Sequence, residues 1–106
     1  VVLTHAHMDH TGFVPRLVKE GFRGVVWCTD ATADLLGLML RDSARLQEEE
    51  AAHANRKGWS RHRPALPLYD IEDAERALKR LQSVGYETEF EPEPGIPFSY
   101  TRAGHI

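Results

Sequence analysis

The stretch His5-Ala6-His7-Met8-Asp9-His10 decides the interpretation of this chain, because it gathers four metal-binding side chains within six residues. It follows Val1-Val2-Leu3-Thr4, a short apolar run that is typical of a buried strand. Side chains at positions i and i+2 leave a strand on the same side, so His5 and His7 should face one way, and the other two ligands follow in the turn before a helix. We therefore expect the four side chains to converge at the end of the strand.

The chemistry of this ligand set favours a catalytic metal site. Imidazole and carboxylate suit zinc, with iron and manganese left open, and the absence of thiolate argues against a closed structural site. Four ligands that point from a strand end and a helix start favour two ions over one. Two ions about 3.5–4 Å apart activate water at neutral pH and hold both charged oxygens of an in-line displacement, which fits phosphodiester hydrolysis. The alternative is a polar helix entry in which the histidines only cap backbone groups.

The histidine near the other end of the chain is a further candidate ligand. A single histidine usually packs or caps, but His105 follows a predicted strand in Ala103-Gly104-His105, where Gly104 permits close backbone approach. We therefore expect His105 to join the metal site. His53 and His62 lie on a polar helix end and in a basic loop, and we expect no ligand role for them.

Short apolar runs alternate with amphipathic segments along the chain, which predicts an α/β fold. The expected elements are a helix over 12–20 capped by Thr11 and ended by Gly21, a strand over 24–29, a helix over 31–54 capped by Thr29 or Asp30, a surface connection over 57–68, a helix over 71–83 capped by Asp70 and ended by Gly85, and strands over 86–91 and 97–102 joined by a turn over 92–95. The inward faces of the two longer helices are predicted to carry Leu35, Leu36, Met39, Leu40, Ala44 and Leu46 in the first, and Ala74, Ala77, Leu78 and Leu81 in the second.

Composition limits the function classes. The formal net charge of −3 gives no global basic field of the kind expected from a self-sufficient nucleic-acid-binding module. Basic residues do gather in Arg56-Lys57 and Arg61-His62-Arg63, but such a run is more often a solvated loop than a binding patch. No apolar run approaches the roughly 18 residues that span a bilayer, so no membrane is expected. The single Cys28 excludes an internal disulfide framework and fits a reducing compartment, so we expect a cytoplasmic location.

The two ends of the sequence suggest that it comes from within a longer protein. It starts at Val1 without an initiator methionine and stops at His105-Ile106 without a polar tail. We therefore expect residues 1–106 to be an internal fragment.

The motif His-x-His-x-Asp-His, present as residues 5–10, resembles the signature of the metallo-β-lactamase fold hydrolases. That resemblance implies an αββα sandwich, of which this chain would supply a part with a mixed sheet and flanking helices. The motif does not choose among β-lactamases, glyoxalases, tRNA-processing nucleases and β-CASP nucleases. The rest of the chain is similar to the β-CASP RNA-processing branch, through Leu3-Thr4-His5, residues 12–15 and 19–24, Ala31-Thr32-Ala33-Asp34-Leu35, Asp42-Ser43-Ala44, Pro67-Leu68-Tyr69, Glu72-Asp73-Ala74 and Ala103-Gly104-His105-Ile106.

By this resemblance the parent protein is a ribonuclease that hydrolyses RNA phosphodiester bonds with two zinc ions. His5, His7 and His105 would hold one zinc, Asp9 and His10 the other, and Asp9 would also orient the attacking water. The family's bridging aspartate, a later histidine and the β-CASP cap with its proton donor would lie beyond Ile106, so the fragment alone should have little or no activity. RNA is then the expected partner, and a homodimer stays open.

Two other functions remain as alternatives. One is a different metallo-β-lactamase-fold hydrolase that acts on a thioester, a lactam or DNA, against which we weigh residues 67–74 and their long spacing to His105. The other is a non-catalytic scaffold subunit of an RNA-processing complex. The intact ligand motif argues against the scaffold, because an inactive member would be expected to lose ligands.

Overall fold

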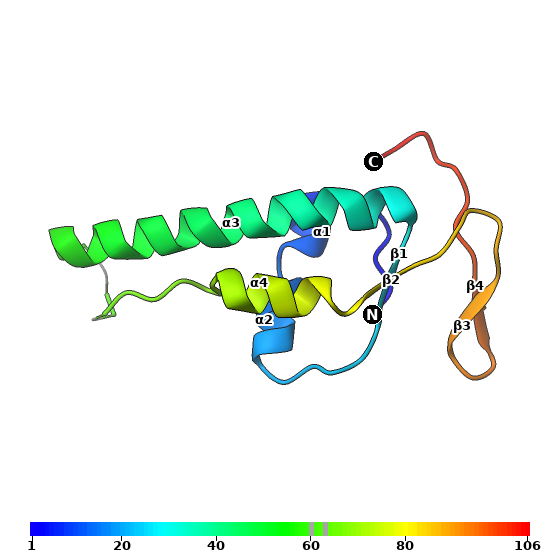
Figure 1. Ribbon diagram of the computed structural model, residues 1–106, viewed down its shortest axis with the longest axis horizontal. Helices are drawn as coiled ribbons and strands as arrows, with labels where there is room; N and C mark the ends of the chain where they lie inside the picture. The colour runs from blue at the N-terminus through cyan, green and yellow to red at the C-terminus, as the bar shows by residue number, and fades with distance from the viewer. Residues whose placement is uncertain (60, 63) are drawn as a thin grey trace.

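The computed structural model describes residues 1–59, 61–62 and 64–106. Ser60 and Arg63 lie outside the described residues, and so does the part of the expected basic connection that they form. The elements in chain order are α1 (Met8–Thr11), α2 (Val14–Lys19), β1 (Val26–Cys28), α3 (Asp30–Lys57), α4 (Ile71–Leu78), β2 (Leu81–Ser83), β3 (Phe90–Glu93) and β4 (Ile96–Phe98). Figure 1 shows α4 beside α3, and the strands near the N-terminal end of α3.

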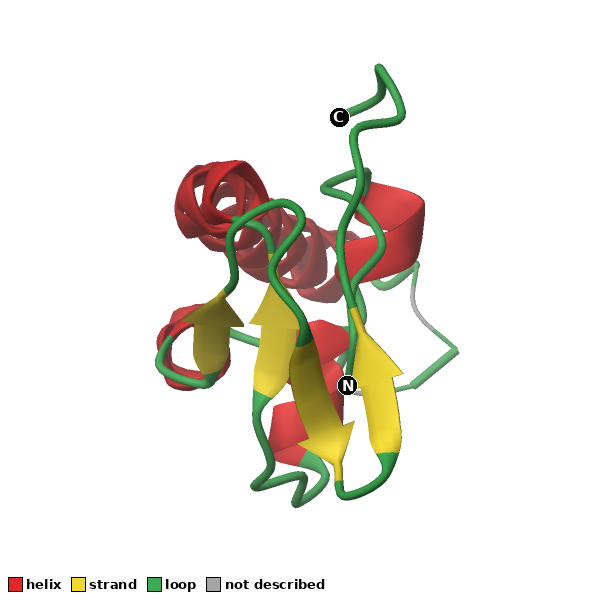
Figure 2. Cartoon of the chain, turned by 90° about the vertical axis from the view of Figure 1, so that its right-hand side faces the viewer, coloured by secondary structure: helices red, strands yellow, loops and turns green. Residues whose placement is uncertain are grey.

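The N-terminal segment is hydrogen-bonded to the edge of a short parallel sheet. Leu3 N–H donates to the Trp27 carbonyl at 2.8 Å and Trp27 N–H donates to the Val1 carbonyl at 2.9 Å. The strand expected over the first residues is thus reduced to an isolated parallel bridge between Val2 and Trp27 of β1. On its other edge β1 pairs in parallel with β2, with Val26 opposite Leu81. The β3–β4 hairpin is antiparallel. The predicted α/β character with both kinds of strand pairing is confirmed, and Figure 2 shows these strands as one layer in front of the helices.

The prediction of one helix over residues 71–83 is wrong at its C-terminal end. Helix α4 ends at Leu78, and the next residues form β2. The reason is non-local: Val26 N–H donates to the Arg80 carbonyl and Val84 N–H donates to the Cys28 carbonyl, both at 2.9 Å. Pairing with β1 satisfies backbone groups that an exposed last helical turn would leave to water, and it overrides a weak helix propensity. Gly85 therefore ends no helix.

Helix α3 begins as predicted, because the Thr29 side chain accepts from Thr32 N–H, and it ends at Gly58 in the left-handed conformation. Its inner face packs on α4, and the shared core holds Leu36, Leu40, Ala44, Tyr69, Ala74 and Ala77. Leu35 and Leu46 were predicted to face inward, but they are exposed. They lie at the edges of the apolar stripe, and only its centre is covered. Among the described residues no helix is long and apolar enough to cross a membrane.

The C-terminal hairpin is shorter and shifted relative to the prediction. Strand β3 covers residues 90–93 rather than 86–91, β4 covers 96–98 rather than 97–102, and the register shifts between Phe90 and Glu93. Pro92 lies inside β3, which an irregular edge tolerates because proline donates no ladder hydrogen bond. Tyr86 and Tyr100 still pair through an isolated bridge, so the chain continues beside the sheet toward its C-terminal end.

Candidate metal centre

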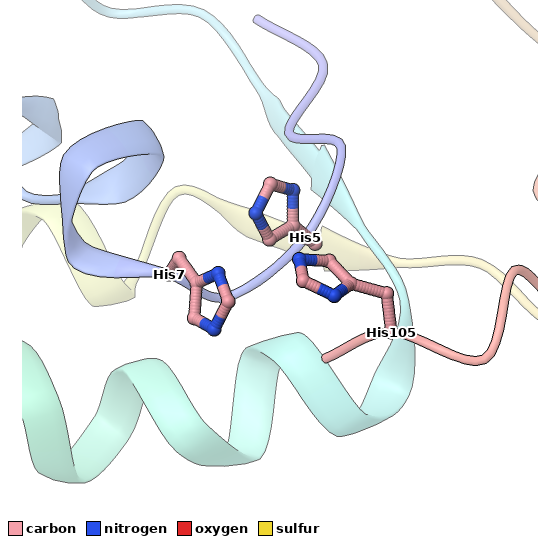
Figure 3. A group of neighbouring side chains, drawn as sticks. All are labelled: His5, His7 and His105. Atoms are coloured by element: carbon pink, nitrogen blue, oxygen red, sulfur yellow. The ribbon is translucent and has the colours of Figure 1, made fainter.

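Three imidazoles from opposite ends of the chain meet at one place. His5, His7 and His105 each offer one ring nitrogen, and these three atoms lie within 4.8 Å of one another. The ring centroids of His5 and His7 are 4.9 Å apart, and His105 is 4.7 Å from each. Figure 3 shows the three rings gathered above the first turns of α3. The structure therefore brings together three of the five side chains that the sequence singled out.

The segment that carries His5 and His7 is fixed from both sides. Before it, Leu3 is tied to β1; after it, the Thr11 hydroxyl donates to the His7 carbonyl at 3.1 Å and contacts the Ala6 carbonyl at 3.3 Å. Thr11 is fully buried and ends α1, so the prediction that it caps a helix over residues 12–20 is wrong. That stretch begins instead with a turn at Gly12 and Phe13, which follows α1, and it continues as α2. The Thr11 hydroxyl supports the ligand loop.

His105 reaches the site on an extended segment rather than on a strand end. Gly104 has a φ of +71° and a Cβ added there would meet no atom within 4 Å. The prediction that Gly104 permits close backbone approach is therefore wrong. Glycine is favoured here because the backbone adopts the left-handed conformation. The turn sends the chain back toward the ligand loop, where Ala6 N–H donates to the Ile106 carbonyl at 3.2 Å. His105 is consequently held beside His5 and His7.

Asp9 and His10 lie in α1, at the border of the cluster. The His10 ring is 4.2 Å from the His5 ring, and its Nε2 lies 3.4 Å from Asp9 Oδ2. Both side chains are largely exposed, and neither is among the described residues whose donor atoms meet within 4.8 Å. The structure thus separates three histidines that face one point from an adjacent aspartate–histidine pair. His53, for which no ligand role was expected, instead packs edge-on against Trp59.

The electrostatics of the cluster suit a cation. Burial lowers the pKa of His5 below its ordinary value of 6.5, and the neighbouring His10, His105 and His7 lower it further, against the opposing effect of Asp9. A lowered pKa keeps the imidazole neutral, and the neutral imidazole is the form that binds a metal ion. The His7 side chain makes no capping hydrogen bond to α1, which argues against a purely capping role for this histidine. The residues present therefore fit a metal.

Two positions near the site were not singled out from the sequence. The Thr4 hydroxyl lies 2.9 Å from His5 Nδ1, and one of the two donates to the other, so Thr4 orients the ring. The Tyr100 hydroxyl donates to the Leu3 carbonyl at 2.9 Å and to the Trp27 carbonyl at 3.1 Å, and it ties the C-terminal segment to the N-terminal segment and to β1. The position of Thr4 directly before His5 was a visible signal for the first contact. No local pattern signals the second.

The chain belongs to the metallo-beta-lactamase superfamily, whose family model matches residues 1–99. Membership implies metal ions, in agreement with the three converging histidines. Curated relatives match over the whole of the chain. They include proteins named transcription termination factor in Methanosarcina mazei, 35% identical over 106 residues, and in Methanococcus maripaludis, 33% identical, and a protein named ribonuclease in Thermus thermophilus, also 33% identical. The chain spans 15% of the first two and 20% of the third.

Proposed function

We propose that this chain is the part of a two-zinc ribonuclease, of the β-CASP type, that supplies most of the metal ligands. The observation that carries the proposal is the meeting of His5, His7 and His105 within 4.8 Å, built from both ends of the chain. The three histidines come from distant segments that backbone hydrogen bonds hold together. Such an arrangement is expected of a ligand site rather than of unrelated surface histidines. The function that uses such a site is metal-dependent hydrolysis.

Each ligand has a proposed role. His5, His7 and His105 would hold one zinc, and Asp9 and His10 would hold the second, a division that the position of this pair beside the cluster on α1 supports. When bound, the ions supply an activated water and stabilise negative charge on the phosphate oxygens. The exposed Asp9 carboxylate would accept a hydrogen bond from the attacking water and orient it, and the contact between the Thr4 hydroxyl and His5 Nδ1 would hold the ring of His5.

Several observations support RNA as the substrate over a thioester, a lactam or DNA. Similar proteins carry the names ribonuclease and transcription termination factor, and the match covers the whole chain. A scaffold that binds RNA without cleaving it is disfavoured, because all five ligand positions keep residues that bind metals. We further propose that the chain is an internal fragment of a metallo-β-lactamase domain and that the β-CASP cap lies elsewhere in a cytoplasmic protein.

The test compares the full protein that contains this chain with its His7→Ala and His105→Ala variants. Metal content is measured by inductively coupled plasma mass spectrometry, and cleavage of a 5′-labelled single-stranded RNA is followed in parallel. We expect about two zinc per chain in the wild type, with zinc content reduced and cleavage at least about 100-fold slower in either variant.

His53→Ala is the matched control, because this histidine packs on Trp59 near the C-terminal end of α3 and is not in the cluster. It should keep both zinc and cleavage. A wild-type protein that holds no metal, or His7→Ala and His105→Ala variants that cleave RNA at the wild-type rate, would overturn the proposal. If the protein retains zinc and hydrolyses a thioester or a lactam but not RNA, the proposal that RNA is the substrate is overturned.

A further inference from the structure

A hollow of about 600 Å³ opens directly beside the histidine cluster. Its described lining residues include His7 and His105 on one side and Tyr86 and Arg102 on another. Its volume falls in the range of about 300–1,000 Å³ that small-molecule sites occupy. The hollow shares His7 and His105 with the candidate metal centre, so a molecule bound there would also contact two of the candidate metal ligands.

Arg102 and Tyr86 form a pair on the rim of this hollow. The Arg102 guanidinium carbon lies 5.5 Å from the centroid of the Tyr86 ring. Both side chains are exposed, Tyr86 at 43%, so the pair is not part of the core. The bridge between Tyr86 and Tyr100 fixes the tyrosine backbone beside the segment that leads to Arg102. The two side chains therefore present an aromatic ring and a cation side by side on the rim of the hollow.

No carboxylate among the described residues neutralises the charge of Arg102. In contrast, Arg41 is paired with Glu75, and Arg45 is paired with Asp42 and Glu49. Arg102 is also the one lysine or arginine among the described residues that line the hollow. A planar guanidinium without a carboxylate partner is a strong recognition group for phosphate.

We propose that Tyr86 and Arg102 form a nucleotide subsite next to the metal centre, in which the Tyr86 ring stacks on a base of single-stranded RNA and Arg102 binds a neighbouring phosphate. Aromatic stacking accepts any base, so the pair positions the strand without selecting a sequence. The inference rests on the proposed function for the identity of the ligand. The ligand motif contains neither Tyr86 nor Arg102. The subsite therefore adds two residues that place the RNA strand against His7 and His105.

The experiment measures RNA affinity separately from cleavage. The full protein is treated with a chelator, and binding of a fluorescein-labelled single-stranded RNA is followed by anisotropy at several salt concentrations. Tyr86→Leu should weaken binding by about 5- to 100-fold. Arg102→Gln should weaken it and lower the slope of log K against log salt by about 0.7, the value for one lost phosphate contact. Arg102→Lys should keep the slope, because it keeps the charge, but bind more weakly than wild type.

Two controls separate this subsite from a general effect on charge or folding. Arg45→Gln removes an arginine that is already paired on α3 and should leave affinity and slope unchanged. Tyr86→Phe keeps the ring and should bind like wild type. The inference is overturned if Tyr86→Leu and Arg102→Gln both bind RNA with wild-type affinity and slope, even where His7→Ala abolishes cleavage. If the wild type neither binds nor cleaves RNA, the proposed function fails together with the subsite.

Discussion

The rings of His7 and His105 lie with their centroids 4.7 Å apart and nearly perpendicular, at 85°, although the two residues come from opposite ends of the chain. No interaction between residues close in the sequence brings the two rings together. Their meeting depends on the sheet, on the hydrogen bond from Ala6 N–H to the Ile106 carbonyl, and on the contacts of the Tyr100 hydroxyl. The geometry of the metal centre is therefore sensitive to changes at residues that bind no metal.

Tyr100→Phe tests this dependence. Burial and the nearby Cys28 raise the pKa of Tyr100 to about 12, so its hydroxyl stays a donor to the Leu3 and Trp27 carbonyls throughout the working pH range. Its loss should cost about 0.5–1.5 kcal/mol of stability. Because the hydroxyl ties the segment of His105 to that of His5, zinc affinity, measured by competition with a chelating dye, should fall about 10-fold.

Tyr69→Phe is the matched control. It also removes a buried tyrosine hydroxyl, which lies 2.9 Å from Ser43 Oγ, but it does so in the contact between α3 and the segment before α4. It should lose similar stability and keep the wild-type zinc affinity. Equal affinities in Tyr100→Phe and wild type would show that the hydroxyl does not position His105.

The carboxylate of Asp73 predicts a dependence of stability on acid pH. Burial of its side chain, which is 2% exposed, raises its pKa, but the hydrogen bond from Asp70 N–H and the charges of Lys19 and Arg76 outweigh burial and hold the pKa below the ordinary 3.8. The ionised carboxylate therefore stabilises the fold above about pH 3.8, and this contribution is lost as the pH falls through the lower folded-state value.

Asp73→Asn should therefore destabilise α4 by about 1–2 kcal/mol at neutral pH, because it weakens the reciprocal cap with Asp70 and leaves Lys19 without its partner. The difference from wild type should shrink as the pH falls below about 3.8, because the unfolded wild-type chain then binds a proton that the folded carboxylate binds only at lower pH. Hydrogen exchange of the α4 amides, corrected for intrinsic rates, measures both. A difference that is constant from pH 7 to pH 3 would contradict the role of the charge.

Local signals in the sequence were sufficient for the starts of elements and for the ligand motif. Thr29 and Asp70 cap α3 and α4 as predicted, because a cap depends on a side chain and a backbone N–H three residues away. The gathering of His5 and His7 follows from strand spacing in the same way. The prediction that His105 would return to the site relied on its place after the last predicted strand and on Gly104, and the structure places its ring beside His5 and His7.

What failed depends on partners far along the chain. Residues 81–83 continue an apolar helical pattern, but the open edge of β1 pairs with them and makes them a strand. The hydroxyl of Thr11 resembles a cap for a following helix, yet it bonds backward to the ligand loop. Tyr100 gives no local sign that it reaches Leu3 and Trp27. In each case the deciding contact joins residues that local sequence patterns do not connect.

A pair of leucines on α3 tests which face of this helix supports the fold. Leu40 is fully buried in the core, whereas Leu38 is 73% exposed. Leu40→Ala should lower the free energy of unfolding by about 2–5 kcal/mol through lost burial and a residual cavity. Leu38→Ala should change it by less than about 0.5 kcal/mol. Pulse proteolysis in increasing urea reports both values, and equal effects would mean that the register of α3 is different.

The buried thiol of Cys28 tests the packing of β1. Burial, with a further contribution from Asp30, raises the pKa of Cys28 from 9.0 to about 11, so at pH 8 the group is a neutral thiol with little nucleophilicity. Iodoacetamide should leave Cys28 unmodified in the native protein and alkylate it after unfolding in guanidinium, as read by peptide mass spectrometry. Ser83 is paired with Cys28 across β1 and β2 but is exposed, so a Cys28→Ala/Ser83→Cys variant serves as the reactive control. Native Cys28 should react at least about 100-fold more slowly than the cysteine of that variant, and similar rates would contradict the burial of β1 between the helices and its neighbouring strands.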